Sequence, residues 1–521
     1  MTPRSGNRMV KYQEPLVFLV GAGPGHPELV TVRAVNCLAQ ADLVLYDRLV
    51  SARILDYAPT HAERVCVTQL AEHHRDRGSR VHEIMVAAAR QGKRLVRLKG
   101  GDPFLFGRGG EEAEFLRQAG IPFEIVPGVT AGIAAGIFTG IPLTHRFFSS
   151  AVALVTGHEV SDKDESALDW AILSRFSGTL VFYMGFARLP KIVHSLIHHG
   201  KDPTTPAAMV RLASTAEQQT VEAPLKDLPA KVAAAGLTSP AILLVGPVVA
   251  LRSKLAWFEQ RPLFGKRVLV TRPRHQALDL VRRLEGLGAN PVVLPVVDVG
   301  PPKDWGPVDQ AIAGLADYQW LVFTSTNGVQ AFFQRLRKNG RDLRTLGNIR
   351  LAVIGPGTAD ALRQYHLEPD LVPPQYRSES LALALSEKAQ GQRILLARAD
   401  RGRDLLRAQL SRVATVDPIV VYSQENVVDP NSEVFNYLRR GEIDFVTLTS
   451  TNIAKAFFKN LDGDCREHIR RGKTKLISIS PVTSAEIKQL GFPVAAEATE
   501  YTMAGVVEAL LNLASPATVN P

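Results

Sequence analysis

The segment from Gly100 to Glu112 has the residue types and spacing best suited to chemistry. It reads GGDPFLFGRGGEE and places five glycines around one aspartate, one arginine and two glutamates. Such glycine density exposes the backbone to a flat or bulky ligand, and an arginine fork can hold a carboxylate through two hydrogen bonds. The alternative interpretation is a glycine-rich turn in which Arg108 and Glu111 only pair with each other.

A second glycine-rich loop, GAGPG at residues 21–25, follows an apolar run. Closely spaced glycines let backbone N–H groups approach a ligand, which could be a phosphate. However, the loop departs from the G-x-G-x-x-G pattern, and Pro24 removes one donor. The chain also lacks a G-K-S/T motif, so the sequence does not support nucleoside triphosphate hydrolysis.

Short apolar runs bounded by glycine alternate with helical patterns in the first half of the chain. Examples are PLVFLVGAG, ADLVLYD, FEIVPG, GTLVFYMG and PAILLVGPVV. This alternation predicts α/β layers in which buried strands alternate with amphipathic helices. A boundary is expected near residues 257–265, because a fresh strand pattern begins at Lys266.

The second half contains an internal repeat. Residues 323–336 read FTSTNGVQAFFQRL and residues 448–461 read LTSTNIAKAFFKNL, at an offset of 125 that persists to Ile354/Ile479 and Tyr376/Tyr501. Two similar α/β units are therefore predicted in series. A duplicated two-lobed protein usually binds its ligand in the cleft between the lobes.

Composition places the chain among globular proteins of several domains. Its 521 residues are 45% hydrophobic and 21% charged, and the formal net charge is +10. The excess is divided as +4 in residues 1–260 and +6 in residues 261–521. It could match nucleic acid, an anionic membrane surface or a strongly acidic small substrate.

Other sequence features predict a protein of the reducing cytoplasm. The three cysteines are far apart and form no paired motif, so neither a disulfide framework nor a zinc site is expected. The apolar run at residues 16–20 is too short for a signal peptide. Residues 126–143 lack charge and have glycine at every fourth position from 128 to 140, but we interpret this segment as a buried helix rather than a membrane span.

The first half resembles S-adenosylmethionine-dependent uroporphyrinogen-III C-methyltransferase, a tetrapyrrole methylase. The segments that carry this resemblance include VGAGPGHPELVT, ADLVLYDRLVS, RLKGGDPFLFGRGGEE, VPGVTA and GIPLTHR. The resemblance implies S-adenosylmethionine as methyl donor, without a metal, and a homodimer formed through this half. It implies donor contacts at Pro24, Gly100, Gly101, Asp102, Leu105, Thr130, Ala131, Met184 and Ala213. It assigns substrate positioning and proton handling, the catalytic roles, to Asp47, Arg108, Glu111 and Met184.

The chain departs from this family at two places. Thr68-Gln69 follows Val67 where the family has Gly-Lys, and Gln69 cannot titrate in the proton-donor role that the family assigns to the lysine. Residues 81–85 read VHEIM where the family has Q-x-x-I-N. Nearby basic residues could compensate, although we interpret each as part of a solvated face: Arg75, Arg77, Arg80 and His82.

Residues 262–515 resemble uroporphyrinogen-III synthase, on the segments VLVTRP, VIGPGTA, ILLARADRGRDLL, VVYS and SISPVTS. The family fold implies two α/β lobes, the first from residues 262–298 and 423–515 and the second from residues 299–422. Tyr422 matches a tyrosine proposed to act as an acid on the departing hydroxyl. Substrate contacts are expected at Thr271, Arg272, Ser325, Thr358, Ser450 and Thr483, each of which could instead be a strand end or a helix cap.

The complete prediction is a two-lobed tetrapyrrole methylase at residues 15–261 followed by a two-lobed, internally duplicated α/β synthase, with short tails at residues 1–14 and 516–521. Hydroxymethylbilane would be cyclised to uroporphyrinogen III and then methylated twice to precorrin-2. No nucleic-acid or membrane partner is expected. A methylase with a degenerate, structural synthase half is the alternative, because Ser480 and Val482 replace the family's glycine and threonine. An RNA-binding methylase is disfavoured, because basic residues and aromatics do not cluster.

Overall fold

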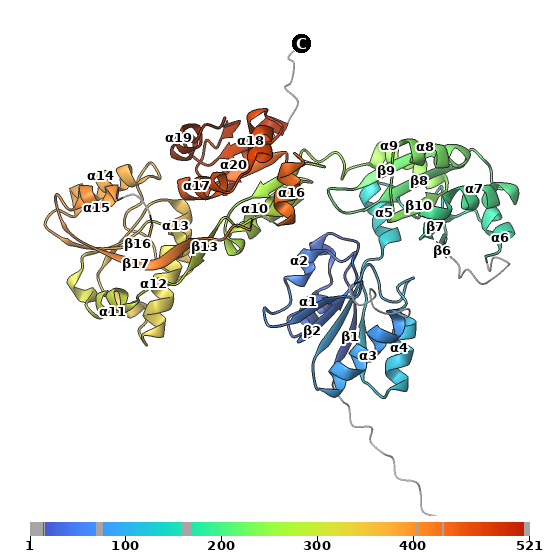
Figure 1. Ribbon diagram of the computed structural model, residues 1–521, viewed down its shortest axis with the longest axis horizontal. Helices are drawn as coiled ribbons and strands as arrows, with labels where there is room; N and C mark the ends of the chain where they lie inside the picture. The colour runs from blue at the N-terminus through green and yellow to red at the C-terminus, as the bar shows by residue number, and fades with distance from the viewer. Residues whose placement is uncertain are drawn as a thin grey trace, which may run out of the picture. The chain divides into compact units, whose positions relative to one another are not determined.

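The computed structural model describes residues 14, 16–68, 77–157, 168–401, 404–429 and 432–514. The chain divides into two compact units, Met1–Gly265 and Lys266–Pro521. Each unit contains two five-stranded sheets covered by helices (Figure 1). The predicted α/β class, with two lobes in each half, is confirmed.

The first sheet of unit 1 is entirely parallel, in the order β3-β2-β4-β1-β5. Its strands are β1 (Val17–Gly21), β2 (Leu43–Tyr46), β3 (Glu63–Cys66), β4 (Leu95–Lys99) and β5 (Phe123–Val126). The helices that follow them are α1 (Val32–Leu38), α2 (Ala52–Leu55), α3 (Arg77–Arg90) and α4 (Gly109–Gln118).

Both faces of this sheet are buried, which explains the continuous apolar runs of its strands. On one face Val20, Val44 and Val96 pack with residues of α1 and α2. On the other face Leu19 and Leu45 pack with residues of α3 and α4. The carboxyl ends of the parallel strands therefore meet at one edge, where the glycine-rich loops begin.

The second sheet of unit 1 is mixed, in the order β6-β7-β10-β8-β9. Strands β6 (Val152–Thr156) and β7 (Thr179–Tyr183) are parallel, and β8 (Pro206–Arg211), β9 (Gln219–Pro224) and β10 (Ala241–Val245) pair antiparallel. Its helices are α5 (Ala131–Thr139), α6 (Trp170–Arg175), α7 (Leu189–His198), α8 (Leu228–Ala234) and α9 (Arg252–Leu255).

The uncharged segment 126–143 forms the end of β5, a loop and the nine-residue helix α5. Its glycines allow close contacts, because a Cβ on Gly132 would lie 2.4 Å from the Tyr183 hydroxyl and one on Gly136 would lie 2.7 Å from the Ile141 carbonyl oxygen. Within the described part of the chain, no helix is long and apolar enough to span a membrane.

The first sheet of unit 2 is parallel, in the order β12-β11-β18-β19-β20. Its strands are β11 (Arg267–Val270), β12 (Asn290–Val293), β18 (Phe445–Leu448), β19 (Lys475–Ser478) and β20 (Ala496–Glu497). Its helices are α10 (Arg274–Gly286), α16 (Glu433–Arg439), α17 (Thr451–Lys459), α18 (Gly463–Arg470), α19 (Pro481–Gln489) and α20 (Met503–Ala514).

The second sheet of unit 2 has the order β13-β17-β16-β14-β15. Its strands are β13 (Val297–Gly300), β14 (Trp320–Phe323), β15 (Arg350–Val353), β16 (Arg393–Ala399) and β17 (Thr415–Asn426). Its helices are α11 (Gly306–Ala313), α12 (Thr326–Lys338), α13 (Pro356–Arg363), α14 (Ser378–Lys388) and α15 (Leu405–Leu410).

The chain crosses between the two sheets of unit 2 at β13 and β17. These strands pair antiparallel, from Val297 opposite Asn426 to Gly300 opposite Ser423. The expected lobe division at 298/299 falls within this paired ribbon, and the one at 422/423 falls at its end. Both divisions remain a prediction.

The internal repeat forms the same local structure twice. Ser325 and Ser450 cap α12 and α17 with nearly identical extended φ values of −166°, and each side chain accepts a hydrogen bond from the N–H three residues later. A serine at this position satisfies a donor that the first turn leaves unpaired. The duplicated S-T-N motif is thus a duplicated helix start.

Candidate active sites

Unit 1 contains a cavity of about 710 Å³ where loops from its two sheets converge. One wall comes from the carboxyl ends of β1, β2 and β4, and another comes from β7, β8 and β10. Ligands of open α/β sheets commonly bind beyond the carboxyl ends of the strands. Every unit 1 residue that the resemblance singled out lines this cavity: Pro24, Asp47, Gly100, Gly101, Asp102, Leu105, Arg108, Glu111, Thr130, Ala131, Met184 and Ala213.

Three backbone segments touch on one side of this cavity. A Cβ on Gly21 would lie 2.6 Å from the Gly101 carbonyl oxygen, and a Cβ on Gly128 would lie 2.3 Å from the same atom. Asp102 ties the loops together, because its carboxylate accepts hydrogen bonds from the N–H groups of Gly128 at 3.1 Å and Phe104 at 2.8 Å. The glycines therefore form a cradle in which backbone rather than side chains faces a ligand.

Backbone strain concentrates around the same cavity. Of the six described non-glycine residues with positive φ, four line it: Phe106, Arg108, Met184 and Leu212. This conformation is unfavourable for side chains with a Cβ and is retained mostly at functional sites. The strain supports the assignment of this cavity as an active site independently of any motif.

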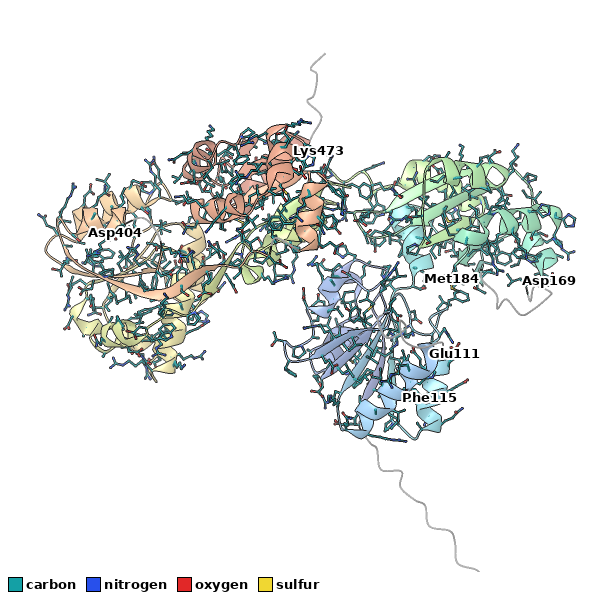
Figure 2. All side chains as sticks on the ribbon, in the orientation of Figure 1. Glu111, Phe115, Asp169, Met184, Asp404 and Lys473 are labelled. Carbon is teal, nitrogen blue, oxygen red and sulfur yellow. The ribbon has the colours of Figure 1, made fainter. Side chains whose placement is uncertain are left out.

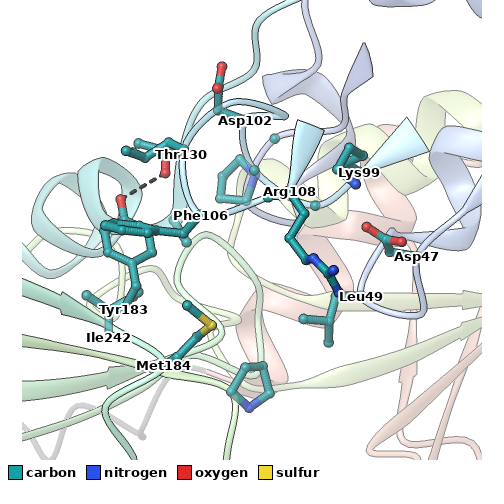
Figure 3. A pocket seen from close by; sticks show the side chains of 18 of the residues that line it. Asp47, Leu49, Lys99, Asp102, Phe106, Arg108, Thr130, Tyr183, Met184 and Ile242 are labelled. Atoms are coloured by element: carbon teal, nitrogen blue, oxygen red, sulfur yellow. Dashed lines mark hydrogen bonds between the residues drawn. The ribbon is translucent and has the colours of Figure 1, made fainter. Parts of the chain in front are cut away.

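Thr130 and Tyr183 form a polar contact on the wall opposite Asp47 (Figure 3). Their hydroxyl oxygens lie 2.8 Å apart, and the Tyr183 hydroxyl also accepts a hydrogen bond from the Gly132 N–H at 2.9 Å. Burial raises the pKa of Tyr183, so its hydroxyl remains protonated at neutral pH. The Phe106 ring packs on Tyr183 with 4.8 Å between centroids.

Arg108 and Glu111 lie at the exposed part of the cavity wall. Their closest charged atoms are 3.7 Å apart, and their side chains are 77% and 59% exposed. Such an exposed pair contributes little to stability. Arg108 and Glu111 do face each other, as the alternative interpretation of the sequence predicted. Because this pair is exposed and weak, both groups remain available to a ligand.

Sequence reasoning missed two charged residues of this cavity, Arg97 and Lys99, and noted Glu112 only as part of the glycine-rich segment. Lys99 Nζ and Arg97 Nε both donate to Glu112 Oε1, at 2.8 Å and 3.0 Å. Arg97 Nη2 also donates to Asp47 Oδ1 at 2.6 Å. The sequence did contain a signal for Arg97 and Lys99. They are two positions apart in the apolar strand LVRLK, so their side chains must point to the same face of the sheet.

Unit 2 contains a smaller cleft of about 400 Å³ lined by residues from both of its sheets' loops. Four of the sequence-predicted residues line it: Arg272, Ser325, Tyr422 and Ser450. The hydroxyl oxygens of Tyr422 and Ser325 lie 3.0 Å apart. Burial is the main reason that the pKa of Tyr422 is raised, so this group remains a proton donor.

The other three predicted substrate contacts lie outside the cleft lining. Thr271 is fully buried, and its hydroxyl donates to the Thr447 carbonyl oxygen at 2.6 Å. Thr358 and Thr483 are buried in the first turns of α13 and α19. The structure therefore gives these hydroxyls core positions, because their side chains point inward from the strand end and the helix starts.

Arginines that the sequence did not single out line the cleft beside Arg272. Arg398 and Arg407 lie on either side of Asp404, at 2.7 Å and 3.8 Å, and Arg401 contacts Asn426 at 3.2 Å. Figure 2 labels Asp404 at the start of α15. Arg272 contacts the Gln276 side chain at 3.1 Å, and no carboxylate of a described residue forms an ion pair with it. Burial lowers its pKa.

Two family models match separate parts of the chain. Residues 16–229 match tetrapyrrole (corrin/porphyrin) methylases, and residues 279–508 match uroporphyrinogen-III synthase HemD. The porphyrin biosynthesis protein HemD of Ruminiclostridium josui is 36% identical over 447 residues, which cover 85% of this chain and 88% of that protein. The chain belongs to this methylase–synthase family.

Further relatives match the methylase part. Siroheme synthase of Pseudomonas putida strain F1 is 50% identical over 244 residues, which span 47% of this chain and 52% of that protein. The crystal structure of uroporphyrin-III C-methyl transferase from Thermus thermophilus, complexed with S-adenyl homocysteine, is 39% identical and covers 45% of this chain and 99% of that one, with a TM-score of 0.38. The two family models and the Ruminiclostridium josui relative confirm, at family level, the two resemblances inferred from the motifs.

The structure describes the side chains of two of the basic residues considered as replacements for the family lysine, Arg80 and His82. Gln69 and Arg75 lie outside the described residues, as does the Arg77 side chain. Arg80 pairs with Glu83 at 3.0 Å on the exposed face of α3. His82, which we expected on a solvated face, is half-buried, lines the cavity and stacks on Phe115 with 4.5 Å between ring centroids, because α3 packs against α4.

In the synthase half, the substitution at Ser480 has a structural role. Ser480 caps α19, and its side chain accepts a hydrogen bond from the Thr483 N–H. The equivalent first-repeat position is Gly355, which precedes α13. A serine fits here because its extended φ of −162° is open to any residue, and Val482 is 36% exposed beside it.

Proposed function

We propose that this bifunctional tetrapyrrole biosynthesis enzyme performs two consecutive reactions. Residues 262–515 cyclise hydroxymethylbilane to uroporphyrinogen III with inversion of the last ring. Residues 15–261 transfer two methyl groups from S-adenosylmethionine to uroporphyrinogen III and so form precorrin-2. The observation that carries this proposal is the unit 1 cavity, which gathers every residue expected from the methyltransferase resemblance into one strained, glycine-lined site.

The glycine cradle supports the methyl donor. In the proposal, backbone groups of Gly100, Gly101, Ala131 and Ala213 contact S-adenosylmethionine, with Pro24, Asp102, Leu105, Thr130 and Met184 around it. The contact between Gly21, Gly101 and Gly128 leaves no room for side chains there. A flat nucleoside can therefore approach the backbone.

Methyl transfer depends mainly on positioning. The pyrrole carbon of a reduced tetrapyrrole is electron-rich, so the site must align it with the sulfonium methyl group and accept the displaced proton. In the proposal, Arg108 holds a substrate carboxylate, and Glu111 and Met184 orient the ring from opposite walls. Asp47, held by Arg97, takes part in proton handling.

Ring closure in the synthase half requires the departure of a hydroxyl group from a linear polycarboxylate. Tyr422 is the proposed acid because its protonated hydroxyl lines the cleft and is oriented by Ser325. Arg272, together with Arg398, Arg401 and Arg407, supplies positive charge for the carboxylates. This polar and positively charged lining favours an active synthase half over the alternative of a degenerate, structural one.

We also propose that the enzyme forms a homodimer through the methylase half. Apolar side chains are exposed on α5 and near β6, among them Ile133 at 43%, Ile137 at 53% and Phe147 at 81%. Apolar patches of this kind mark interaction surfaces. An Ile137→Asp variant is expected to shift the solution mass measured by light scattering to that of one chain.

The proposed compartment is the cytoplasm, because the three cysteines are free, buried thiols, as a reducing compartment would keep them.

One assay tests both reactions. Purified protein is incubated with hydroxymethylbilane, with and without S-adenosylmethionine. Type-III porphyrinogen without the donor and precorrin-2 with it are expected. If only the type-I porphyrinogen forms, the synthase proposal fails. If added uroporphyrinogen III gains no methyl group, the methyltransferase proposal fails.

A further inference from the structure

A cluster of four charged side chains lies on one wall of the methyltransferase cavity. Arg97 and Lys99 come from β4, Glu112 from α4, and Asp47 follows β2. The side chains of Arg97, Lys99 and Glu112 are 5%, 3% and 8% exposed, whereas that of Asp47 is 35% exposed. Figure 3 shows Lys99 and Asp47 side by side at this wall, facing the same space as Arg108. The cluster thus connects a buried amine to a partly solvated carboxylate.

This charged cluster is not an efficient way to stabilise the fold. Burying three charges carries a desolvation cost that their mutual attraction often fails to exceed, and apolar side chains of similar size could fill the same space. Buried charges that line a cavity are instead typical of sites where acid–base properties are tuned.

The two carboxylate oxygens of the buried Glu112 differ in their contacts. Its Oε1 accepts from both Lys99 and Arg97, whereas its buried Oε2 has no hydrogen-bond partner among the residues that the structure describes. Buried carboxylate oxygens are normally satisfied. The carboxylate, on a side chain more than nine-tenths buried, therefore keeps acceptor capacity beyond its bonds to Lys99 and Arg97.

The sequence gives a reason to seek a titratable amine at another position of this cavity. Gln69 replaces the lysine to which the resemblance assigns proton transfer, and an amide cannot titrate. Among the described residues that line the cavity, Lys99 is the sole lysine.

We propose that Lys99 is the proton acceptor of the methyl-transfer reaction in this chain, with Glu112 and Arg97 as positioning residues. The inference rests on the proposed methyltransferase function. The nucleophilic ring carbon uses its double-bond electron pair to form the new bond to the methyl carbon, and the sulfur–methyl electron pair remains on sulfur. The attack leaves positive charge on the neighbouring ring carbon and its nitrogen. The neutral Lys99 amine then takes a proton from the bridging carbon attached to that ring carbon, and the C–H electron pair forms a new double bond between these two carbons, which removes the charge.

Lys99 becomes an ammonium in this step, and the cluster stabilises it. Glu112 and Asp47 provide opposite charge, and the partly exposed Asp47 connects the site to water for release of the proton. Burial, followed by the positive charge of Arg97, lowers the pKa of Lys99, whereas Glu112 and Asp47 raise it. The neutral amine is therefore accessible at lower pH than for an exposed lysine. The cavity lining has further titratable or charged groups: His82, Asp102, Arg108, Glu111 and Tyr183.

The test compares Lys99→Ala, Lys99→Arg and, as a matched control, Lys93→Met on the exposed surface. Rates of uroporphyrinogen III methylation are measured against pH, and S-adenosylhomocysteine binding by calorimetry reports an intact cavity. We expect kcat to fall about 100-fold or more in both Lys99 variants, with donor affinity within about threefold of wild type. Added methylamine should restore rate to Lys99→Ala, which a structural role would not produce.

Glu112→Gln provides a second readout. The kcat of wild type should rise with pH as Lys99 loses its proton, and removing Glu112 should move that rise to lower pH. A fully active Lys99→Arg variant would overturn the proposal, because arginine keeps the charge but does not deprotonate, and so would an unmoved pH profile in Glu112→Gln. If Lys99→Ala fails to bind S-adenosylhomocysteine, the kcat of Lys99→Arg and the pH profile of Glu112→Gln test the proposal in its place. Wild-type protein that methylates no tetrapyrrole would refute the proposed function instead.

Discussion

The hydroxyl groups of Tyr422 and Ser325 lie 3.0 Å apart, although 97 residues separate them in the sequence. Tyr422 is on the long strand β17, and Ser325 caps α12, so the contact joins a crossing strand to the start of a repeated helix. Ser325 is therefore both a helix cap and an orienting group for the proposed acid. Of the two alternatives that the sequence left open for Ser325, the helix cap is observed, and the substrate contact remains a prediction.

Replacing Tyr422 with phenylalanine should disable ring closure with little loss of stability. The change removes the acid, and general acid catalysis typically contributes 10²- to 10⁴-fold to a rate. The lost hydrogen bond to Ser325 is worth only about 1 kcal/mol. Enzymatic formation of type-III porphyrinogen from hydroxymethylbilane measures the effect, with Tyr365→Phe outside the cleft as control. A Tyr422→Phe rate within threefold of wild type would contradict the assignment.

The synthase reaction should also retain its acid at high pH. Burial raises the pKa of Tyr422 above the ordinary value of about 10, so the hydroxyl loses its proton only above that value. Tyr422 should therefore cause no alkaline fall in kcat below about pH 10. An alkaline fall near pH 8 that Ser325→Ala shifts would assign the titration to this pair and refute the prediction.

Arg272 should control substrate affinity in the synthase cleft. A charge-assisted hydrogen bond contributes about 1.5–3 kcal/mol, so Arg272→Gln is expected to raise KM for hydroxymethylbilane about 10- to 100-fold. The KM of the variant should depend less on ionic strength than that of wild type, because salt screens the lost attraction. The neighbouring exposed Arg274→Gln is the matched control. Equal KM values for both variants would rule out this role.

Gly128 should be essential for the donor cradle. A Cβ at this position would lie 2.3 Å from the Gly101 carbonyl oxygen and 2.9 Å from Gly21 Cα, so Gly128→Ala must separate two loops. We expect S-adenosylhomocysteine binding to weaken at least about 10-fold by calorimetry. Gly110→Ala is the control, because no atom lies within 4 Å of its added Cβ. Unchanged binding by Gly128→Ala would show that the loops move apart without cost.

Asp462 should stabilise α18 in a pH-dependent way. Its carboxylate accepts the Cys465 N–H at 3.0 Å and pairs with Arg439 at 2.7 Å, which lowers its pKa to about 2. The stabilisation is therefore full above the unfolded-state pKa of about 3.9 and is lost as pH falls toward 2. Because the side chain is 39% exposed, solvent screening limits the charge effect to about 0.5–1 kcal/mol.

Asp462→Asn isolates this effect, since asparagine also caps helices but carries no charge. Hydrogen-exchange protection of α18 amides should be lower in the variant at pH 7, and the difference should shrink below about pH 4. A difference independent of pH would mean that cap geometry, and not the charge, accounts for the stabilisation.

Much of the fold could be predicted because its signals are local. Buried strands on both faces of a sheet require continuous apolar runs, which is why PLVFLV and AILLV were predicted as strands and occur as β1 and β10. The repeated S-T-N motif marks two helix starts, because a serine cap acts on the next turn of its own segment. Gly100 to Glu112 was predicted to face a ligand because its glycine density exposes the backbone.

The directions of individual side chains could not be predicted in this way. Thr271, Thr358 and Thr483 fit a binding motif, but whether a hydroxyl enters the cleft or the core depends on how its strand or helix packs. The arginines that join Arg272 in the cleft come from residues 398–407, more than a hundred positions away, and no local pattern relates them.

The sequence by itself determined the α/β class and the duplicated second half, because these depend on short-range hydrophobic periodicity and on a repeated motif. Its resemblance to the methyltransferase family pointed to twelve of the residues that line the unit 1 cavity. Only the tertiary structure decided that Arg97 and Lys99 share Glu112 and that Arg97 holds Asp47. Each of these contacts joins two elements whose separation along the chain does not reveal how close they lie in space. The electrostatic character of the site therefore arises from packing.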